Sequence, residues 1–161
     1  MLVEARAVIP QVGRLPGIDG KAKMSKSQSN AIALSASPEE IGRAVHLMYT
    51  DPNHLRPSDP GTVEGNVVFT YLDAFDWDEG HVAELKTQYR RGGLGDAVVK
   101  QRLETVLQDL LTPIRERRAA YARDPDYVLD VIRDGTGRGR AVTQATLEEV
   151  RAGLGLFRFD A

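Results

Sequence analysis

The chain has 161 residues, of which 42% are hydrophobic and 27% charged, and its formal net charge is −2. This composition is typical of a globular protein, and the small net charge excludes a strongly basic nucleic-acid binder, so any RNA contact needs a local basic patch. The absence of cysteine excludes disulfide bonds and thiolate metal sites. No apolar run approaches about 18 residues and the N-terminus lacks the pattern of a signal peptide, so we expect a cytoplasmic protein without a membrane span.

Residues 1–36 contain one short apolar run, Ala7 to Ile9, which predicts a single short strand. The next notable stretch is GKAKMSKSQSN, residues 20–30. Lysine ammonium and serine hydroxyl groups donate hydrogen bonds, and small residues let the backbone approach a ligand, so this stretch suits phosphate oxygens. A solvated linker has a similar composition, but Met24 and the turn-rich approach LPGIDG favour a defined loop. We therefore predict an extended phosphate-binding loop, which lacks the spacing of a P-loop.

From residue 37 onward the sequence predicts only helices. SPEE marks the start of the first, over residues 37–50, with Ser37 as N-cap and Glu40 completing a capping box. Apolar residues three and four apart predict the following helices, with a kink or break at Pro113 and a flexible glycine-rich connection over 134–140. The fold class is therefore mainly α: a bundle of about six helices preceded by the short strand and the extended loop. The later helices are expected over 64–75, 78–91, 96–123, about 125–135 and 141–153.

KMSKS, residues 23–27, is identical to the signature loop of the class I aminoacyl-tRNA synthetases. Its surroundings, LPGIDGKAKMSKSQSNAI, resemble the loop of the tryptophanyl-tRNA synthetase family. DPGTVEGNVV, LGDAVVKQRLETVLQDLLTPIRERRAAY and VIRDGTGRGRAVTQATLEEVRAGLGL follow in that family's order, so the resemblance covers nearly the whole chain. The tyrosyl family is the nearest competitor, but its bacterial members usually vary this loop and append a different C-terminal domain.

The resemblance implies a ligase that activates tryptophan with ATP and Mg²⁺ and passes the tryptophanyl group to its tRNA. Lys23 and Lys26 are the implied catalytic residues, which stabilise the charge on the leaving pyrophosphate. The serines of the loop would donate hydrogen bonds to phosphate or hold the loop closed, and a backbone contact to adenine is implied at Leu15. No metal-ligating residue is implied. The implied ATP-binding residues are Leu15, Lys23, Met24, Ser25, Lys26 and Ser27.

Two domains are implied: residues 1–36 as the end of the catalytic nucleotide-binding domain, and residues 37–161 as a helical tRNA- and anticodon-binding domain. The other class I signature, a His-x-Gly-His element, is missing, because none of His46, His54 and His81 lies in such a setting. We therefore expect the C-terminal half of the enzyme, with the nucleotide-binding fold, the tryptophan pocket and most of the family's homodimer region upstream. Alone, it should not activate tryptophan. With no partner surface to close against, its loop should be mobile and the loop lysines should be solvated.

Features outside the loop have alternative interpretations. Trp77 is expected to anchor the start of a helix in the core. An arginine cluster near the end of the long helix could meet tRNA phosphates or bases, or could be a set of solvated cations favoured at a helix C-terminus. Two other functions stay open: a free-standing helical RNA-binding or protein-interaction module with a vestigial loop, and a helical scaffold. The clustered arginines are Arg115, Arg117, Arg118 and Arg123, and the same two interpretations apply to Arg90 and Arg91 at the end of an earlier helix.

Overall fold

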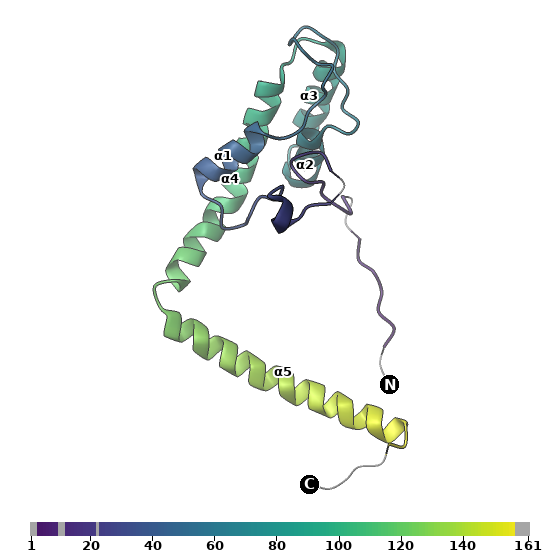
Figure 1. Cartoon of the computed structure of the whole chain (residues 1–161), viewed down its shortest axis with the longest axis vertical. Helices are drawn as coiled ribbons and strands as arrows, with labels where there is room; N and C mark the ends of the chain where they lie inside the picture. The colour runs from purple at the N-terminus through teal and green to yellow at the C-terminus, as the bar shows by residue number, and fades with distance from the viewer. Residues whose placement is uncertain (1–2, 10–11, 22, 157–161) are drawn as a thin grey trace. The chain divides into compact units, whose positions relative to one another are not determined.

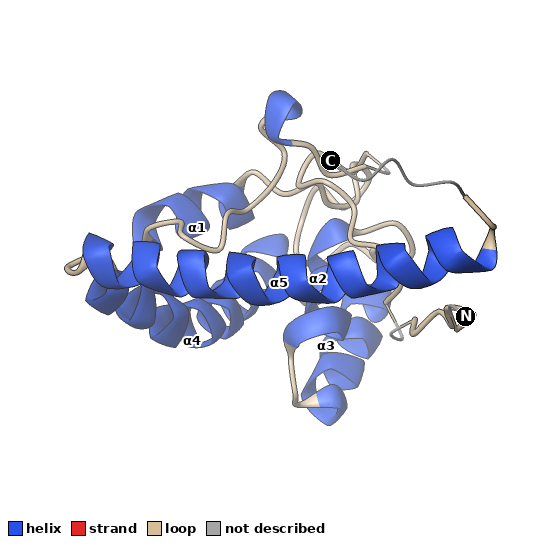
Figure 2. Cartoon of the chain, turned by 90° about the horizontal axis from the view of Figure 1, so that it is seen from below, coloured by secondary structure: helices blue, strands red, loops and turns tan. Residues whose placement is uncertain are grey.

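The computed structural model describes residues 3–9, 12–21 and 23–156. In these residues it contains five α-helices, a short 3-10 turn and no strand (Figures 1 and 2). The chain divides into two compact units, one formed by Ile9–Glu116 and the other by the residues before and after it. The predicted mainly α fold is confirmed, whereas the predicted domain boundary at residue 36 stays a prediction.

Helices α1 (Pro38–His46) and α2 (Val67–Phe75) begin at side-chain caps. The Ser37 hydroxyl accepts the Glu40 N–H at 3.2 Å, and the Glu40 carboxylate accepts the Ser37 N–H at 2.7 Å, so the predicted capping box is complete. Asn66 caps α2 by accepting a backbone N–H of the first turn at 3.0 Å. Local hydrogen bonding therefore determines where both helices start.

Helices α3 (Glu79–Arg91) and α4 (Asp96–Tyr121) are the longer pair of the first unit. Asp78 caps the start of α3, and Gly92, with a φ of 83°, follows its last residue as the C-cap. A Cβ at Gly92 would lie 2.3 Å from a backbone carbonyl oxygen of the loop between α1 and α2, so only glycine fits this turn. Helix α4 continues through Pro113, so the proline does not split it.

The core of this unit lies between its four helices. Lys100 in α4 donates to the backbone carbonyl of His46 at 2.7 Å, and Gln108 donates to that of Pro38 at 2.9 Å, so both ends of α1 are bonded to α4. Figure 1 shows α1 lying beside α4. Burial of each large apolar side chain contributes about 1.5–3 kcal/mol. The fully buried side chains include Ile41, Val45, Val67, Val68, Phe69, Leu72, Tyr89, Val99 and Leu103.

Helix α5 (Pro125–Gly153) is continuous, so the prediction of a sixth helix and of a glycine-rich connection is wrong. Asp124 caps its start by accepting a backbone N–H at 3.0 Å. Within the glycine-rich stretch, Asp134 and Arg138 form an ion pair at 3.2 Å with helical spacing. Each interior glycine costs a helix only about 1 kcal/mol relative to alanine, which does not by itself interrupt a well-capped helix.

Two further predictions are not supported by the fold. Residues 3–9 are irregular, and the predicted strand there is not confirmed. A strand needs a neighbour to pair its backbone groups, and the described part of the chain contains none. Trp77 is not a core anchor, because it lies in the turn between α2 and α3 with 94% of its surface exposed. The core at this turn is reached instead by Phe75, which packs partly buried against it.

The turn between α2 and α3 is held by an ion pair. The carboxylate of Asp76, whose side chain is 3% exposed, accepts hydrogen bonds from Arg102 Nε at 2.7 Å and from a terminal guanidinium nitrogen at 2.8 Å. These bonds lower the pKa of Asp76 below its ordinary value, although burial opposes them. The pair therefore connects the turn to α4 as long as the carboxyl group is ionised.

Replacing Arg102 with methionine is expected to lower the free energy of unfolding at pH 7 by about 2 kcal/mol, because a buried carboxylate loses its charged donor. In the unaltered chain the folded pKa of Asp76 lies below the unfolded value of about 3.9, so this stability is present above pH 4 and is lost as pH falls through the folded value. Arg102→Met should therefore lose less stability on acidification. Urea unfolding at several pH values measures both effects. Arg90→Met, which removes an exposed pair with Glu64, is the control, and equal losses in the two variants would contradict the assignment.

Replacing Gly135, Gly137 and Gly139 together with alanine is expected to raise both the helix content and the melting temperature of α5. Apart from the backbone of its own helix, a Cβ at each position would meet no described atom within 4 Å, and each alanine should contribute about 1 kcal/mol. Far-UV circular dichroism during heating measures the change. Gly92→Ala, at a positive φ, should destabilise the chain instead. A loss of helix content in the triple variant would show that these residues do not belong to a continuous helix.

Candidate phosphate-binding loop

The approach to the lysine loop (residues 20–30) is bonded to the helical core. The hydroxyl of Tyr71, in α2, donates to the carbonyl of Pro16 at 2.9 Å, and the N–H of Tyr49 donates to the carbonyl of Ile18 at 2.8 Å. Burial raises the pKa of Tyr71 to about 12, so the hydroxyl stays a donor at neutral pH. Leu15 and Ile18 also pack, partly buried, against the core. The loop therefore begins from a fixed backbone.

Inside the lysine loop, the amide of Asn30 organises the backbone. Asn30 is 2% exposed, and its Oδ1 accepts the N–H of Ser25 at 2.7 Å. Its Nδ2 donates to the carbonyl of Lys23 at 3.1 Å and to the carboxylate of Asp19 at 3.0 Å. The backbone is therefore held on both sides of Met24, whose side chain packs partly buried against the core, as expected of a defined loop.

The bonds of Asn30 to the backbone of Ser25 and Lys23 argue against the mobility expected of the loop. Lys23 and Lys26 are exposed, as expected. None of the ion pairs among residues 3–9, 12–21 and 23–156 involves either lysine. The hydroxyl oxygens of Ser25 and Ser27 lie 2.9 Å apart. The loop thus presents two ammonium groups and two hydroxyls within KMSKS, which is a donor set suited to phosphate oxygens. The roles that the sequence assigns to these residues stay predictions.

Leu15, the predicted adenine contact, lines an open hollow of about 430 Å³. Phe75 and the exposed ring of Trp77 contribute to the same hollow, so part of its wall is aromatic. A flat apolar wall suits a nucleobase, but Asp73 and Glu79 line the hollow as well. The contact of Leu15 with adenine stays a prediction.

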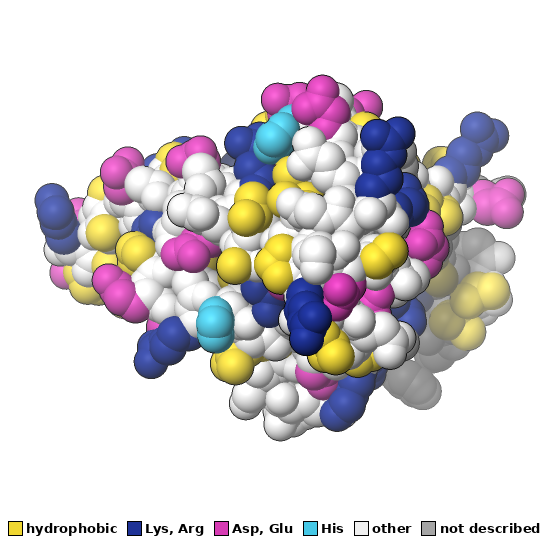
Figure 3. Space-filling model, turned by 90° about the horizontal axis from the view of Figure 1, so that it is seen from above, with side chains coloured by type: hydrophobic (Ala, Val, Ile, Leu, Met, Phe, Trp, Pro, Cys, Tyr) yellow, Lys and Arg dark blue, Asp and Glu magenta, His cyan; other side chains and the backbone are white. Residues whose placement is uncertain are grey.

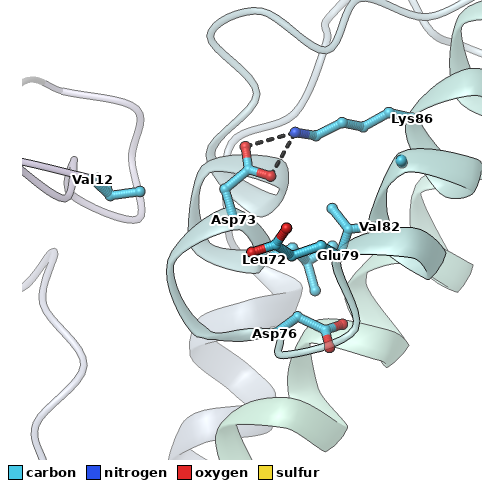
Figure 4. A pocket seen from close by; sticks show the side chains of 8 residues that line it. Val12, Leu72, Asp73, Asp76, Glu79, Val82 and Lys86 are labelled. Carbon is cyan, nitrogen blue, oxygen red and sulfur yellow. Dashed lines mark hydrogen bonds and ion pairs between the residues drawn. The ribbon is translucent and has the colours of Figure 1, made fainter. Parts of the chain in front are cut away.

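A second hollow, of about 360 Å³, lies between α2 and α3 and is a poor site for phosphate. Figure 4 shows Lys86 reaching across to Asp73, with which it pairs at 2.5 and 2.7 Å, and shows further carboxylates of Asp76 and Glu79 on the wall. Carboxylates repel phosphate, and Lys86, the one lysine among the described residues of the wall, is already paired. Among the described residues, no group of histidines and carboxylates could hold a metal ion.

Sequence reasoning did not identify a polar cluster at the start of α4. Asp96 accepts hydrogen bonds from the Tyr89 hydroxyl at 2.7 Å and from the Thr50 hydroxyl at 2.9 Å, and it lies 3.3 Å from Nδ1 of His54. Burial and the bond to Asp96 raise the pKa of Tyr89. The cluster joins α3, α4 and the loop between α1 and α2, so its role is structural. Its partners are far apart in sequence, and no local pattern could have revealed it.

The predicted arginine cluster divides into two kinds of residue. Arg115 is used within the fold, where it donates to the Thr112 hydroxyl at 2.7 Å and to the Gln108 side chain at 3.2 Å. Arg117, Arg118 and Arg123 are exposed. On the face shown in Figure 3, acidic and basic side chains are interspersed, which agrees with the small net charge of the chain.

An aromatic surface accompanies the exposed arginines where α5 begins. The rings of Tyr121 and Tyr127 are stacked with centroids 6.1 Å apart and planes 9° apart, and both residues are exposed. Arg118 and Tyr121 line an open hollow of about 550 Å³ with Leu129. Exposed aromatic rings beside a guanidinium group suit the stacking of unpaired bases.

Comparison with known proteins identifies the family of the chain. The family model described as tRNA synthetases class I (W and Y) matches residues 3–112. A tryptophan–tRNA ligase of Clostridium longisporum is 50% identical and one of Lactococcus lactis subsp. lactis is 45% identical, each over 99% of this chain. Each alignment covers 48% of the relative, so the chain spans about half the length of these curated relatives. None of the described helices combines the length and apolar character of a membrane span.

Solved structures agree with the sequence match. The tryptophanyl-tRNA synthetase from Campylobacter jejuni, complexed with ADP and tryptophan, has a TM-score of 0.72 at 25% identity, over 89% of this chain and 44% of that one. The enzyme from Giardia lamblia has a TM-score of 0.58 at 29% identity, over 65% of this chain and 28% of that one. The residues that the family model matches include the whole lysine loop and most of α4. The chain therefore belongs to the class I tRNA synthetases of the W and Y family, and the relatives that it matches are tryptophan–tRNA ligases.

Proposed function

We propose that this chain is the C-terminal half of a tryptophan–tRNA ligase and that its lysine loop serves the activation of tryptophan. In that reaction the carboxylate of tryptophan attacks the α-phosphate of ATP, which gives tryptophanyl-adenylate and pyrophosphate. The tryptophanyl group then passes to the 3′ end of its tRNA. The observation that carries the proposal is the KMSKS sequence on a backbone bonded to the core, with two lysines that form no ion pair with any described residue.

The chemistry of the loop follows from where charge develops. As the bond to the α-phosphate breaks, negative charge moves onto the leaving pyrophosphate, and fixed donors there stabilise the transition state most. Lys23 and Lys26 supply that charge, while the hydroxyls of Ser25 and Ser27 donate to phosphate oxygens or keep the loop closed. In this proposal Mg²⁺ arrives on the phosphates of ATP, because lysine cannot ligate it and the described residues offer no metal cluster.

The proposal also includes what the chain cannot do alone. In this proposal the nucleotide-binding fold and the tryptophan pocket would lie in the part of the enzyme that corresponds to the unmatched half of the relatives, so the isolated chain should not activate tryptophan. The domain boundary at residue 36, the homodimer and a cytoplasmic location are part of the same proposal. The relatives favour it over a tyrosyl enzyme or a free-standing RNA-binding module.

A contact with tRNA is the second part of the function. The stacked pair of Tyr121 and Tyr127 offers a platform for an unpaired base, and the exposed arginines nearby offer donors for phosphate. This combination supports a contact with a single-stranded segment of the tRNA rather than with a helix.

Activation can be tested with a hybrid that joins the N-terminal half of the Clostridium longisporum ligase to this chain. The hybrid should catalyse tryptophan-dependent ATP–pyrophosphate exchange, whereas the isolated chain should not. Lys26→Ala should lower kcat by about 10²–10³ and leave KM for tryptophan nearly unchanged, because the lost interaction belongs to the transition state. Lys86→Ala, at a paired lysine, is the control. An inactive hybrid, or equal rates for the two variants, would reject the proposal.

The tRNA contact predicts a salt-dependent affinity. Each phosphate contact with a single strand contributes about 0.7 to the slope of log affinity against log salt, so replacing Arg117, Arg118 and Arg123 with alanine should reduce the slope by about 2. Filter binding of tryptophan tRNA to the chain at several salt concentrations measures the slope. Arg90→Ala, at an arginine paired with Glu64, should leave it unchanged. An unchanged slope in the triple variant would mean that these arginines are only solvated cations.

A further inference from the structure

We infer that Asn30, acting with Asp19, is a positioning residue that sets how the lysine loop presents Lys23 and Lys26 to phosphate. The effect on phosphate binding rests on the proposed function of the loop. The effect on the conformation of the loop does not depend on it.

The hydrogen bonds of Asn30 require a side-chain amide. Its single oxygen accepts the N–H of Ser25 at 2.7 Å, and its NH₂ group donates to the carbonyl of Lys23 at 3.1 Å and to Oδ1 of Asp19 at 3.0 Å. An aspartate at this position could accept but not donate, and an alanine could do neither. The backbone carbonyl of Asn30 accepts the N–H of Ile18 at 2.9 Å, so the same residue joins the end of the loop to its anchored approach.

The amide of Asn30 is also closely packed against the backbone of Gly17. A Cβ at Gly17 would lie 2.3 Å from Nδ2 of Asn30 and 2.6 Å from Oδ1 of Asp19. Gly17 also closes the turn before the loop, since its N–H donates to the carbonyl of Lys21 at 2.9 Å. The amide is therefore held by contacts on one side and by hydrogen bonds on the other, which leaves it one orientation.

Asp19 contributes a negatively charged carboxylate that bonds to Asn30 and Lys21. Burial alone would raise the pKa of Asp19, but the hydrogen bonds from Asn30 and Lys21 and the nearby ammonium lower it, so the carboxylate is ionised at neutral pH. It pairs with the ammonium of Lys21 at 3.4 Å and accepts the backbone N–H of that residue at 3.1 Å. One lysine of the loop is thereby neutralised, and the charge presented to a ligand comes from Lys23 and Lys26.

The charges of the loop allow a matched set of variants of the whole chain. Asn30→Asp keeps the shape but removes the donors and places two carboxylates together. The double variant Asp19→Asn with Asn30→Asp restores a donor and an acceptor between the two positions and has the same net charge as the unaltered chain. Gly17→Ala removes no hydrogen-bonding group but crowds the amide. Lys26→Ala removes a ligand-facing charge without touching the amide.

Two measurements separate conformation from binding. Hydrogen exchange of the Ser25 amide, followed by NMR, reports its bond to Asn30, and titration with inorganic pyrophosphate reports phosphate affinity. Asn30→Asp and Gly17→Ala should speed exchange and weaken pyrophosphate binding by about tenfold, the scale of one or two lost hydrogen bonds. The double variant should recover part of the affinity. Lys26→Ala should weaken binding without changing exchange at Ser25.

Each result decides between the proposals. Unchanged exchange and unchanged affinity in Asn30→Asp would overturn the positioning role, and so would a double variant that binds pyrophosphate no better than Asn30→Asp. If the unaltered chain does not bind pyrophosphate, the phosphate-binding function of the loop fails. In that case the exchange rate of Ser25 in Asn30→Asp and Gly17→Ala still decides whether Asn30 positions the loop.

Discussion

The lysine loop depends on hydrogen bonds that join its approach to the helical core. Tyr71 in α2 bonds to Pro16, and Tyr49 bonds to Ile18. The carbonyl of Tyr49 in turn accepts the N–H of Val67, the first residue of α2, at 3.3 Å. A loop rich in lysine and serine has too little apolar surface to fold by itself, so these contacts supply the order that its composition lacks. The conformation of the loop therefore depends on the packing of the helical core.

The distribution of charge within the unit follows a consistent pattern. Cations that support the fold are bonded to other groups of the chain: Arg102 and Lys86 to carboxylates, and Lys100 to a backbone carbonyl. Exposed ion pairs stabilise a protein by at most about 1 kcal/mol, so the lack of an ion pair at Lys23 and Lys26 within the described part of the chain costs the fold little. Each ammonium then keeps all its donors for a ligand, and a charge-assisted bond to phosphate is stronger than a neutral one. The loop can therefore present donors to a ligand at little cost to the stability of the fold.

Local signals in the sequence were reliable where one interaction decides the structure. The capping box at Ser37 predicted the start of α1, and KMSKS indicated the family. The glycines at 135–139 were misleading. Their turn-forming composition indicated a connection, whereas the small cost of each glycine does not interrupt a capped helix. Trp77 was wrongly predicted to be buried, because the sequence of a turn does not indicate whether a large apolar side chain faces the core or solvent.

The parts of the site that could not be predicted are the non-local ones. Asn30 bonds to Asp19 across 11 residues, and His54 approaches Asp96 across 42. Such pairs arise only when separate segments have been brought together by the core. The tendency of asparagine to bond to nearby backbone was the one available hint that Asn30 orders the loop, and it specifies no partner. The roles of the loop residues in catalysis remain predictions, because the chain spans about half the length of its curated relatives.

The central claim is that the lysine loop is an ordered phosphate-binding element before any other part of the enzyme is added. A titration of the isotope-labelled chain with magnesium ATP, followed in ¹H–¹⁵N NMR spectra, tests it most directly. The account predicts that the amide signals of Ser25, Lys26 and Ser27 are dispersed in the free chain and shift with ATP, and that Lys23→Ala with Lys26→Ala abolishes the shifts. Signals of the loop that do not respond, while those of Arg118 and Tyr121 do, would contradict it.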